Sequence, residues 1–163
     1  MTNAPTPGPG KNPPPGPAPQ SPPALTGRDI NLAATATRRV LVSALVPFDV
    51  TFEQWTVINQ VGSGGVTTEA AMAALLRTGL QLGEAEIEEQ FAALAAADLV
   101  GRGREGSLGL TTRGQALFER GTAVVADIVA ELYAGFAPDD LVRAHEILVE
   151  ITARAEARLA SVA

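Results

Sequence analysis

Apolar residues recur every three or four positions along most of the chain, the spacing that places them on one side of an α-helix. This spacing predicts helices over residues 27–45, 51–61, 67–79, 84–97, 112–133 and 138–159. Two short stretches, 98–102 and 107–111, are joined by a glycine-containing connection and are typical of a hairpin. The pattern therefore predicts a mainly α-helical protein with one small β-hairpin.

Polar residues mark where several of these helices begin. Thr51 and Gln54 have the spacing of a capping box, in which each side chain covers a free backbone N–H of the first turn. One of the threonines at 67–68 can cap the third helix in the same way. Thr112 and Gln115 repeat the box and predict the start of the long helix.

The first 24 residues have a different composition from the rest of the chain. Ten of the twelve prolines fall between Pro5 and Pro23, mixed with Gly, Ala and Ser, so residues 1–24 are predicted to be a disordered tail. Its interpretation as a flexible leader is favoured over a role as ligand of a proline-binding module. The tail has no apolar run, so we expect no signal peptide, and residues 25–163 are predicted to form one folded domain.

Composition excludes several kinds of site. Cysteine is absent and His145 is the only histidine, which excludes disulfides, thiolate sites and a histidine metal cluster within one chain. We therefore predict no metal, no cofactor and no enzymatic activity. The formal net charge is −6, and no apolar stretch is long and uncharged enough to span a membrane, so a cytoplasmic protein is expected.

The order of motifs resembles the MarR family of winged helix-turn-helix transcriptional regulators. A Thr-capped helix containing Gln54-Trp55 leads into two further helices and a hairpin that runs from Asp98-Leu99-Val100 to Leu110-Thr111 and Gly114. Two long helices follow the hairpin. The resemblance covers roughly residues 29–159, and each motif alone is weak, so it depends on their collinear order.

The resemblance implies an architecture and a function. It places a winged module at about 50–113 and dimerisation helices at about 27–46 and 112–160. It also implies a homodimer that binds double-stranded DNA, with a small-molecule effector in the crevice between the dimer helices and the winged module. Four aromatic residues are candidates for lining that crevice, although a plain core role is favoured for them: Phe48, Trp55, Phe118 and Tyr133.

The last predicted helix supports a dimer independently of the resemblance. Apolar residues alternate by three and four along it, which is the seam that a partner helix needs. The predicted dimer interface consists of Leu141, Ala144, Leu148, Ile151 and Ala155. The alternative is that this seam packs only within its own chain, and His145 lies off it.

The predicted recognition helix, 84–97, lacks the basic residues expected of a helix that enters the major groove. Its solvent face carries Glu84, Glu86, Glu88 and Glu89 together with Gln90, a candidate DNA contact. A few glutamates can also be useful there, because Glu can accept a hydrogen bond from cytosine. Between Glu84 and Asp98 there are five acids and no base. First-turn acids complement the helix dipole, but that accounts for one or two of them.

Arginines around this helix are the other candidate DNA contacts. Arg102 and Arg104 lie in the predicted wing, and Arg77 and Arg113 lie at helix ends. The hairpin lacks the acidic-x-Arg pair that usually ties the wing in the MarR family. The first hypothesis is therefore a dimeric DNA-binding regulator. The alternative is a winged-helix homologue that has lost DNA binding and uses its acidic face to contact a protein.

Overall fold

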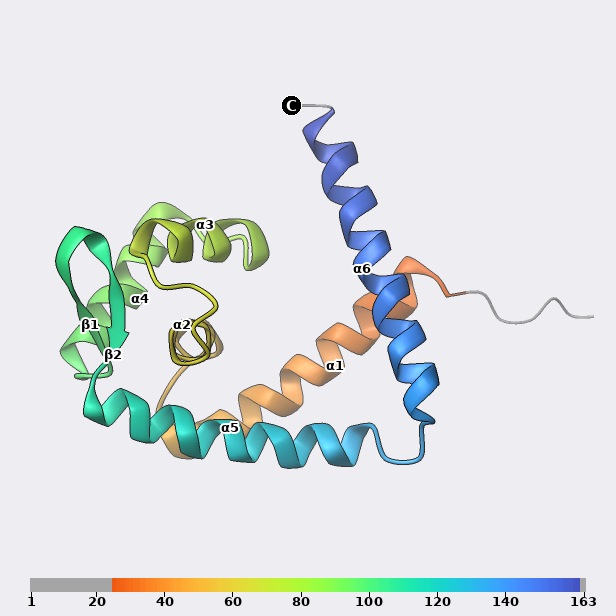
Figure 1. Cartoon of the computed structure of the whole chain (residues 1–163), viewed down its shortest axis with the longest axis horizontal. Coiled ribbons are helices and arrows are strands. Elements are labelled where there is room, and N and C mark those ends of the chain that lie inside the picture. Colours follow the sequence, from red (N-terminus) through yellow and green to blue (C-terminus); the bar gives the residue numbers. More distant parts are fainter. Residues whose placement is uncertain (1–24, 162–163) are drawn as a thin grey trace, which may run out of the picture.

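The computed structural model describes residues 25–161 of the chain. Within these residues it has six α-helices and one two-stranded antiparallel hairpin (Figure 1). In chain order they are α1 (Gly27–Leu45), α2 (Phe52–Gly62), α3 (Glu69–Gly79), α4 (Glu84–Ala96), β1 (Val100–Arg102), β2 (Leu108–Leu110), α5 (Thr112–Leu132) and α6 (Pro138–Ala160). The expected helical fold with one hairpin is confirmed, and the proline-rich stretch 1–24 lies outside the described residues.

Two of the expected caps are confirmed at hydrogen-bond distance. At the start of α2 the Gln54 N–H donates to the Thr51 hydroxyl at 3.2 Å, and the Thr51 N–H donates to the Gln54 side chain at 3.1 Å. Of the two threonines before α3, Thr68 is the cap, because its hydroxyl accepts from the N–H of Ala71. Each cap satisfies a backbone donor that has no partner inside the helix.

The expected cap of α5 is wrong by one residue. Thr111, not Thr112, precedes the helix, and its hydroxyl accepts from the Gly114 N–H at 3.0 Å. The same hydroxyl donates to the carbonyl of Asp98 at 2.6 Å, a tertiary contact that favours Thr111 over its neighbour. Gln115 does not complete a box; its side chain donates to Glu119 instead.

We call α2, α3, α4 and the hairpin the winged module. Its apolar side chains pack on one another, and Val57, Ile58, Met72 and Leu76 are fully buried. The hairpin pairs Val100 with Leu110 and Arg102 with Leu108, which places Val100 and Leu108 in the core and turns the tip outward. Both strands are shorter than expected, and β1 begins only at Val100 because Asp98 adopts a left-handed conformation (φ 55°) in the turn after α4.

We call α1, α5 and α6 the helical region. Its α5 meets α2 at a close contact, where a Cβ on Gly121 would overlap the Trp55 ring. A Cβ on Gly62 would likewise lie 2.6 Å from the ring of Phe118. By contrast, α6 extends away from the winged module, and none of its residues is buried (Figure 1).

Candidate functional site

The α4 helix presents its acidic side chains to solvent. Ile87, Phe91 and Leu94 form its buried face, and Glu84, Glu86, Glu88 and Glu89 are all exposed. Glu86 has a structural role, because it accepts from the backbone N–H of Gly83 at 2.7 Å and so caps its own helix. The four carboxylates therefore lie on the solvent-exposed side of α4, away from its buried face.

Two of the candidate arginines are paired with carboxylates, one on α4 and the other on α3. Arg77, in the last turn of α3, lies 3.5 Å from Glu84 at the start of α4. Arg102 of β1 lies 2.7 Å from Glu69 at the start of α3, and its guanidinium is 5.8 Å from the centroid of the Phe91 ring. Exposed pairs of this kind contribute at most about 1 kcal/mol, so they orient side chains more than they stabilise the fold.

The other two candidate arginines have no such pair within residues 25–161. Arg104 begins the short 3-10 turn Arg104–Gly106 at the tip of the hairpin, and Arg113 lies in the first turn of α5. Both are exposed, and neither has a carboxylate within 4.0 Å among the described residues. These two side chains are available to a ligand without breaking an existing ion pair.

Gln90 is placed differently from the glutamates beside it. Its side-chain oxygen is buried and has no hydrogen-bond partner among the described residues. The amide oxygen is therefore not presented to a ligand in this conformation. Periodicity could not show this, because Gln90 lies at the edge between the buried and exposed faces of α4.

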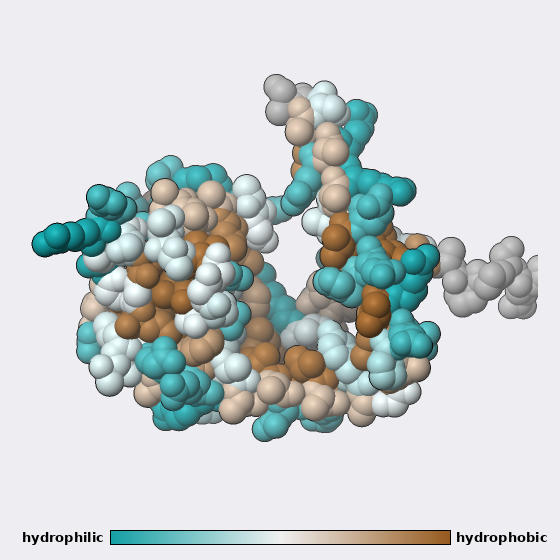
Figure 2. All heavy atoms as spheres, in the orientation of Figure 1, coloured by the Kyte–Doolittle hydropathy of each residue, from teal (hydrophilic) through white to brown (hydrophobic). Residues whose placement is uncertain are grey.

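Apolar side chains are exposed along the helical region. In the predicted interface set, Leu141 is partly buried, Ala144 and Ala155 are exposed, and Leu148 and Ile151 keep 42% and 41% of their surface accessible. Further exposed apolar residues lie on α1, α5 and α6: Leu32, Val40, Val42, Val129, Leu132, Val142, Ile147 and Val149. Figure 2 shows apolar surface on α6 and along the lower edge where α5 runs.

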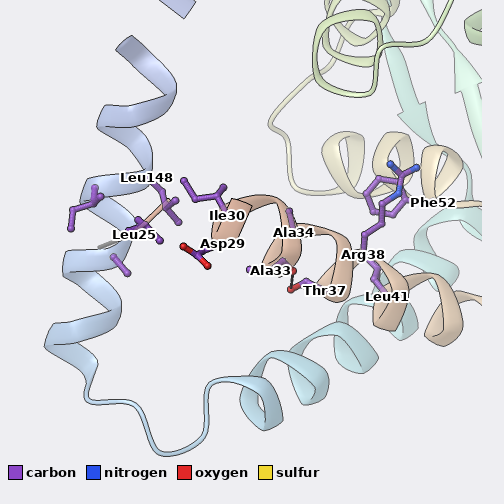
Figure 3. A pocket seen from close by; sticks show the side chains of 12 residues that line it. Leu25, Asp29, Ile30, Ala33, Ala34, Thr37, Arg38, Leu41, Phe52 and Leu148 are labelled. Atoms are coloured by element: carbon purple, nitrogen blue, oxygen red, sulfur yellow. Dashed lines mark hydrogen bonds between the residues drawn. The ribbon is translucent and has the colours of Figure 1, made fainter. Parts of the chain in front are cut away.

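A cavity of about 560 Å³ lies between α1, the start of α2 and α6 (Figure 3). Its walls are mainly apolar and include Ile30 and Leu41 of α1 and Leu148 of α6. Arg38 also lines it, with its guanidinium 4.3 Å from the centroid of the Phe52 ring and 2.7 Å from Glu53. The cavity is therefore mainly apolar, and its charged lining residues are the cation Arg38 and the carboxylate Asp29 (Figure 3).

The aromatic residues considered for an effector crevice do not line this cavity. Trp55 belongs to the buried core, and Phe48 and Phe118 pack against that core. Tyr133 is half exposed at the end of α5. The aromatic side chain that does line the cavity is Phe52, which the hydrophobic pattern offers no reason to select.

Metal ligands do not gather in the part of the chain that the structure describes. No group of three or more His, Asp or Glu side chains within it could hold a metal ion. His145 is exposed on α6. None of the described helices is both long and apolar enough to cross a membrane.

Solved structures with the same arrangement identify the fold. The reduced form of MarR from Escherichia coli superposes with a TM-score of 0.62 at 22% identity, covering 80% of this chain and 95% of that one. A MarR family protein of Mycobacterium tuberculosis in complex with p-aminosalicylic acid gives 0.62 at 19% identity, covering 79% and 99%. MepR, a transcription regulator of the Staphylococcus aureus multidrug efflux pump MepA, gives 0.58 at 17% identity, covering 80% and 99%.

Comparison by sequence gives no match of this kind. No protein-family profile and no curated protein matches the chain. The likeness therefore lies in the three-dimensional arrangement: three short helices and a hairpin between one long helix before them and two after them. The chain has the winged-helix fold of the MarR-type transcriptional regulators.

Proposed function

We propose that this protein is a transcriptional regulator that forms a homodimer and binds double-stranded DNA. The observation that carries the proposal is the unequal burial of its two regions. The winged module has a complete core, whereas the helical region leaves apolar faces of α1, α5 and α6 exposed. A second copy of the chain would cover those faces and would place two winged modules side by side for a two-fold symmetric DNA site.

The wing and the start of α5 supply the cations for DNA. Arg104 and Arg113 are exposed and unpaired among the described residues, so a dimer offers four such side chains. Specific DNA-binding proteins typically neutralise about six to ten phosphates, so four support a salt-sensitive interaction of modest strength. The exposed glutamates of α4 reduce it further by repelling the backbone.

The test is a salt titration of DNA affinity. Fluorescence anisotropy would follow binding to a duplex that covers the region upstream of the protein's own gene, at several salt concentrations. Replacing Arg104 by Gln should reduce the steepness of log K against log salt by about 0.9 for each phosphate that Arg104 neutralises. The control is Arg158→Gln in the last turn of α6, which should leave the slope unchanged. Failure to bind even at low salt would contradict the proposal.

A second candidate function follows from one specific observation. Glu88 and Glu89 are exposed, and no Lys or Arg lies between Glu84 and Asp98. Neither glutamate has a salt-bridge partner among the described residues. Such a face suits a basic protein surface better than a phosphate backbone. Tighter DNA binding by the Glu88→Gln/Glu89→Gln variant would mean that these two carboxylates weaken DNA binding. If the wild-type protein binds no DNA, a basic protein partner becomes the leading hypothesis.

Response to a small molecule is the remaining part of the proposal. The cavity of about 560 Å³ is within the size range of small-molecule sites, and a ligand carboxylate there would share the Arg38 guanidinium with Glu53. The complex of the M. tuberculosis protein with p-aminosalicylic acid supports an aromatic acid as the probe. Calorimetric titration of p-aminosalicylic acid should give binding that Arg38→Gln weakens. Equal binding by both proteins would remove this cavity from the proposal.

A further inference from the structure

We propose that Arg102 positions the wing and does not itself contact DNA. This inference rests on the proposed DNA-binding function. It assigns the DNA contact of the wing to Arg104 alone. In sequence, Arg102 and Arg104 are equivalent candidates, two residues apart on one hairpin. In the structure, Arg102 holds the hairpin to the helices and Arg104 is exposed at its tip.

The geometry around Arg102 joins three elements. Its guanidinium donates to the Glu69 carboxylate at 2.7 Å, linking β1 to the first turn of α3 across 33 positions of the chain. The same guanidinium lies over the ring of Phe91, which belongs to α4. An arginine in both an ion pair and a cation–π contact is held in one orientation.

Backbone contacts hold β2 at the position opposite Arg102. Arg102 pairs across the hairpin with Leu108, whose N–H donates to the carbonyl of Thr67 at 2.8 Å. Thr68 and Ser107 form an isolated antiparallel bridge beside it. The segment before α3 therefore fixes β2 through its backbone, and the Arg102 side chain adds a link from β1 to the first residue of α3.

The tip of the hairpin, between Gly103 and Ser107, is a compact turn. The Gly103 N–H donates to the carbonyl of Ser107 at 2.8 Å, and Glu105 and Gly106 adopt left-handed conformations (φ 57° and 72°). Because the turn has little freedom of its own, the direction of Arg104 depends on where the two strands are anchored. Arg102 thus sets the position of Arg104.

A phosphate contact by Arg102 would be unfavourable. The guanidinium would have to leave Glu69, and that carboxylate would then lie unpaired close to a phosphate of the same charge. Arg104 would meet no such penalty, because it has no carboxylate partner among the described residues.

A double-mutant cycle tests the assignment on the full-length protein. DNA affinity and its salt slope would be measured for Arg102→Gln, Arg104→Gln and the double variant, using the same upstream duplex. If Arg102 acts through Arg104, its substitution weakens binding in the wild type but has no further effect once Arg104 is replaced. If each substitution weakens binding independently, and each reduces the steepness of the salt dependence by about 0.9 per phosphate, Arg102 contacts DNA and the inference is wrong.

Hydrogen exchange, measured without DNA, tests the positioning role of Arg102 independently of whether the protein binds DNA. Arg102→Gln should speed hydrogen exchange at the amides of Gly103 and Leu108, which hold the wing together. The charge-swapped variant Glu69→Arg/Arg102→Glu should restore their protection, since it re-forms the pair. The matched control is Arg143→Gln, which breaks an exposed pair with Glu146 on α6 and should not affect these amides. Unchanged exchange in Arg102→Gln would overturn the positioning role even if the protein binds no DNA.

Discussion

The winged module and the helical region are built from helices of the same amphipathic kind, yet they use their apolar faces differently. In the winged module those faces meet one another, and Val57, Ile58, Met72 and Leu76 are fully buried. In the helical region, α6 has 23 residues and none of them is buried. The winged module therefore buries its apolar faces within one chain, whereas the helical region leaves apolar faces exposed.

The difference shows that amphipathicity and burial are separate properties. A hydrophobic stripe predicts that a helix packs against something, but not whether the partner lies in the same chain. Here the two outcomes occur in one molecule: the stripe of α4 is buried by the module, and the stripe of α6 is exposed.

The largest expected effect is on association of the helical region. Replacing Ile151 by Asp places a carboxylate on the exposed apolar seam, where a dimer would bury it without a partner. We expect the dissociation constant of the dimer to rise by about 100-fold or more, as a penalty of roughly 3 kcal/mol requires. Light scattering over a range of protein concentrations would measure the mass.

His145→Asp is the matched control, because it adds the same charge to α6 away from the predicted seam. It should leave the mass unchanged. If light scattering gives the mass of a single chain at all concentrations of the wild-type protein, the helical region does not form a dimer interface. The difference in burial between the two regions would then not indicate association.

A cavity in the winged module is expected to lower the stability of the fold without affecting association. Leu76 is 0% exposed, so Leu76→Ala should lower the free energy of unfolding by about 2–5 kcal/mol. The dimer mass should stay the same, because the change lies in the other region. Urea unfolding monitored by circular dichroism gives the free energy. Leu159→Ala removes the same atoms at a position that is 71% exposed, and a comparable destabilisation there would contradict the assignment of buried and exposed regions.

A smaller loss of stability is expected from a change at the contact between the two regions. Gly121 of α5 lies against the ring of Trp55, so Gly121→Ala forces the helix and the module apart. Overpacking of this kind costs about 1–3 kcal/mol. Near-ultraviolet circular dichroism of the single tryptophan would report the displaced ring, and urea unfolding would measure the decrease in stability. Gly27→Ala, which meets nothing within 4 Å, should show neither change.

Local signals in the sequence predicted much of the fold. Thr51 with Gln54, Thr68, and Pro138 at the start of α6 each specify a helix end through chemistry within four residues. The Thr26–Asp29 capping box of α1 was missed although Thr-x-x-Asp is a visible signal. At Thr111-Thr112 the local signal is ambiguous, and the carbonyl of Asp98, distant in sequence, favours the first threonine.

The candidate site was less predictable because its properties depend on pairs distant in sequence. Nothing near Arg102 indicates that Glu69 holds it, and nothing near Arg77 indicates its contact with Glu84. Residue type and spacing therefore identified four candidate arginines, with ordinary surface solvation favoured for Arg77 and Arg113. The three-dimensional pairing divides them into two whose guanidinium groups are paired with carboxylates and two that have no carboxylate partner among the described residues.

The smallest effect is expected at the N-terminus of α1, where the helical region begins. The Thr26 hydroxyl and backbone N–H both donate to the Asp29 carboxylate, and these hydrogen bonds lower the pKa of Asp29 below its ordinary value. The folded state therefore favours the ionised form, so the cap contributes stability above the unfolded pKa and loses it as the pH falls through the folded pKa. NMR of the Thr26 amide during acid titration should show a midpoint below the ordinary aspartate range, whereas Asp29→Asn should show no titration there. A midpoint at or above the ordinary range would mean that the carboxylate does not cap α1. The caps of α2 and α3 should be unaffected in either case, because both are formed by neutral threonines.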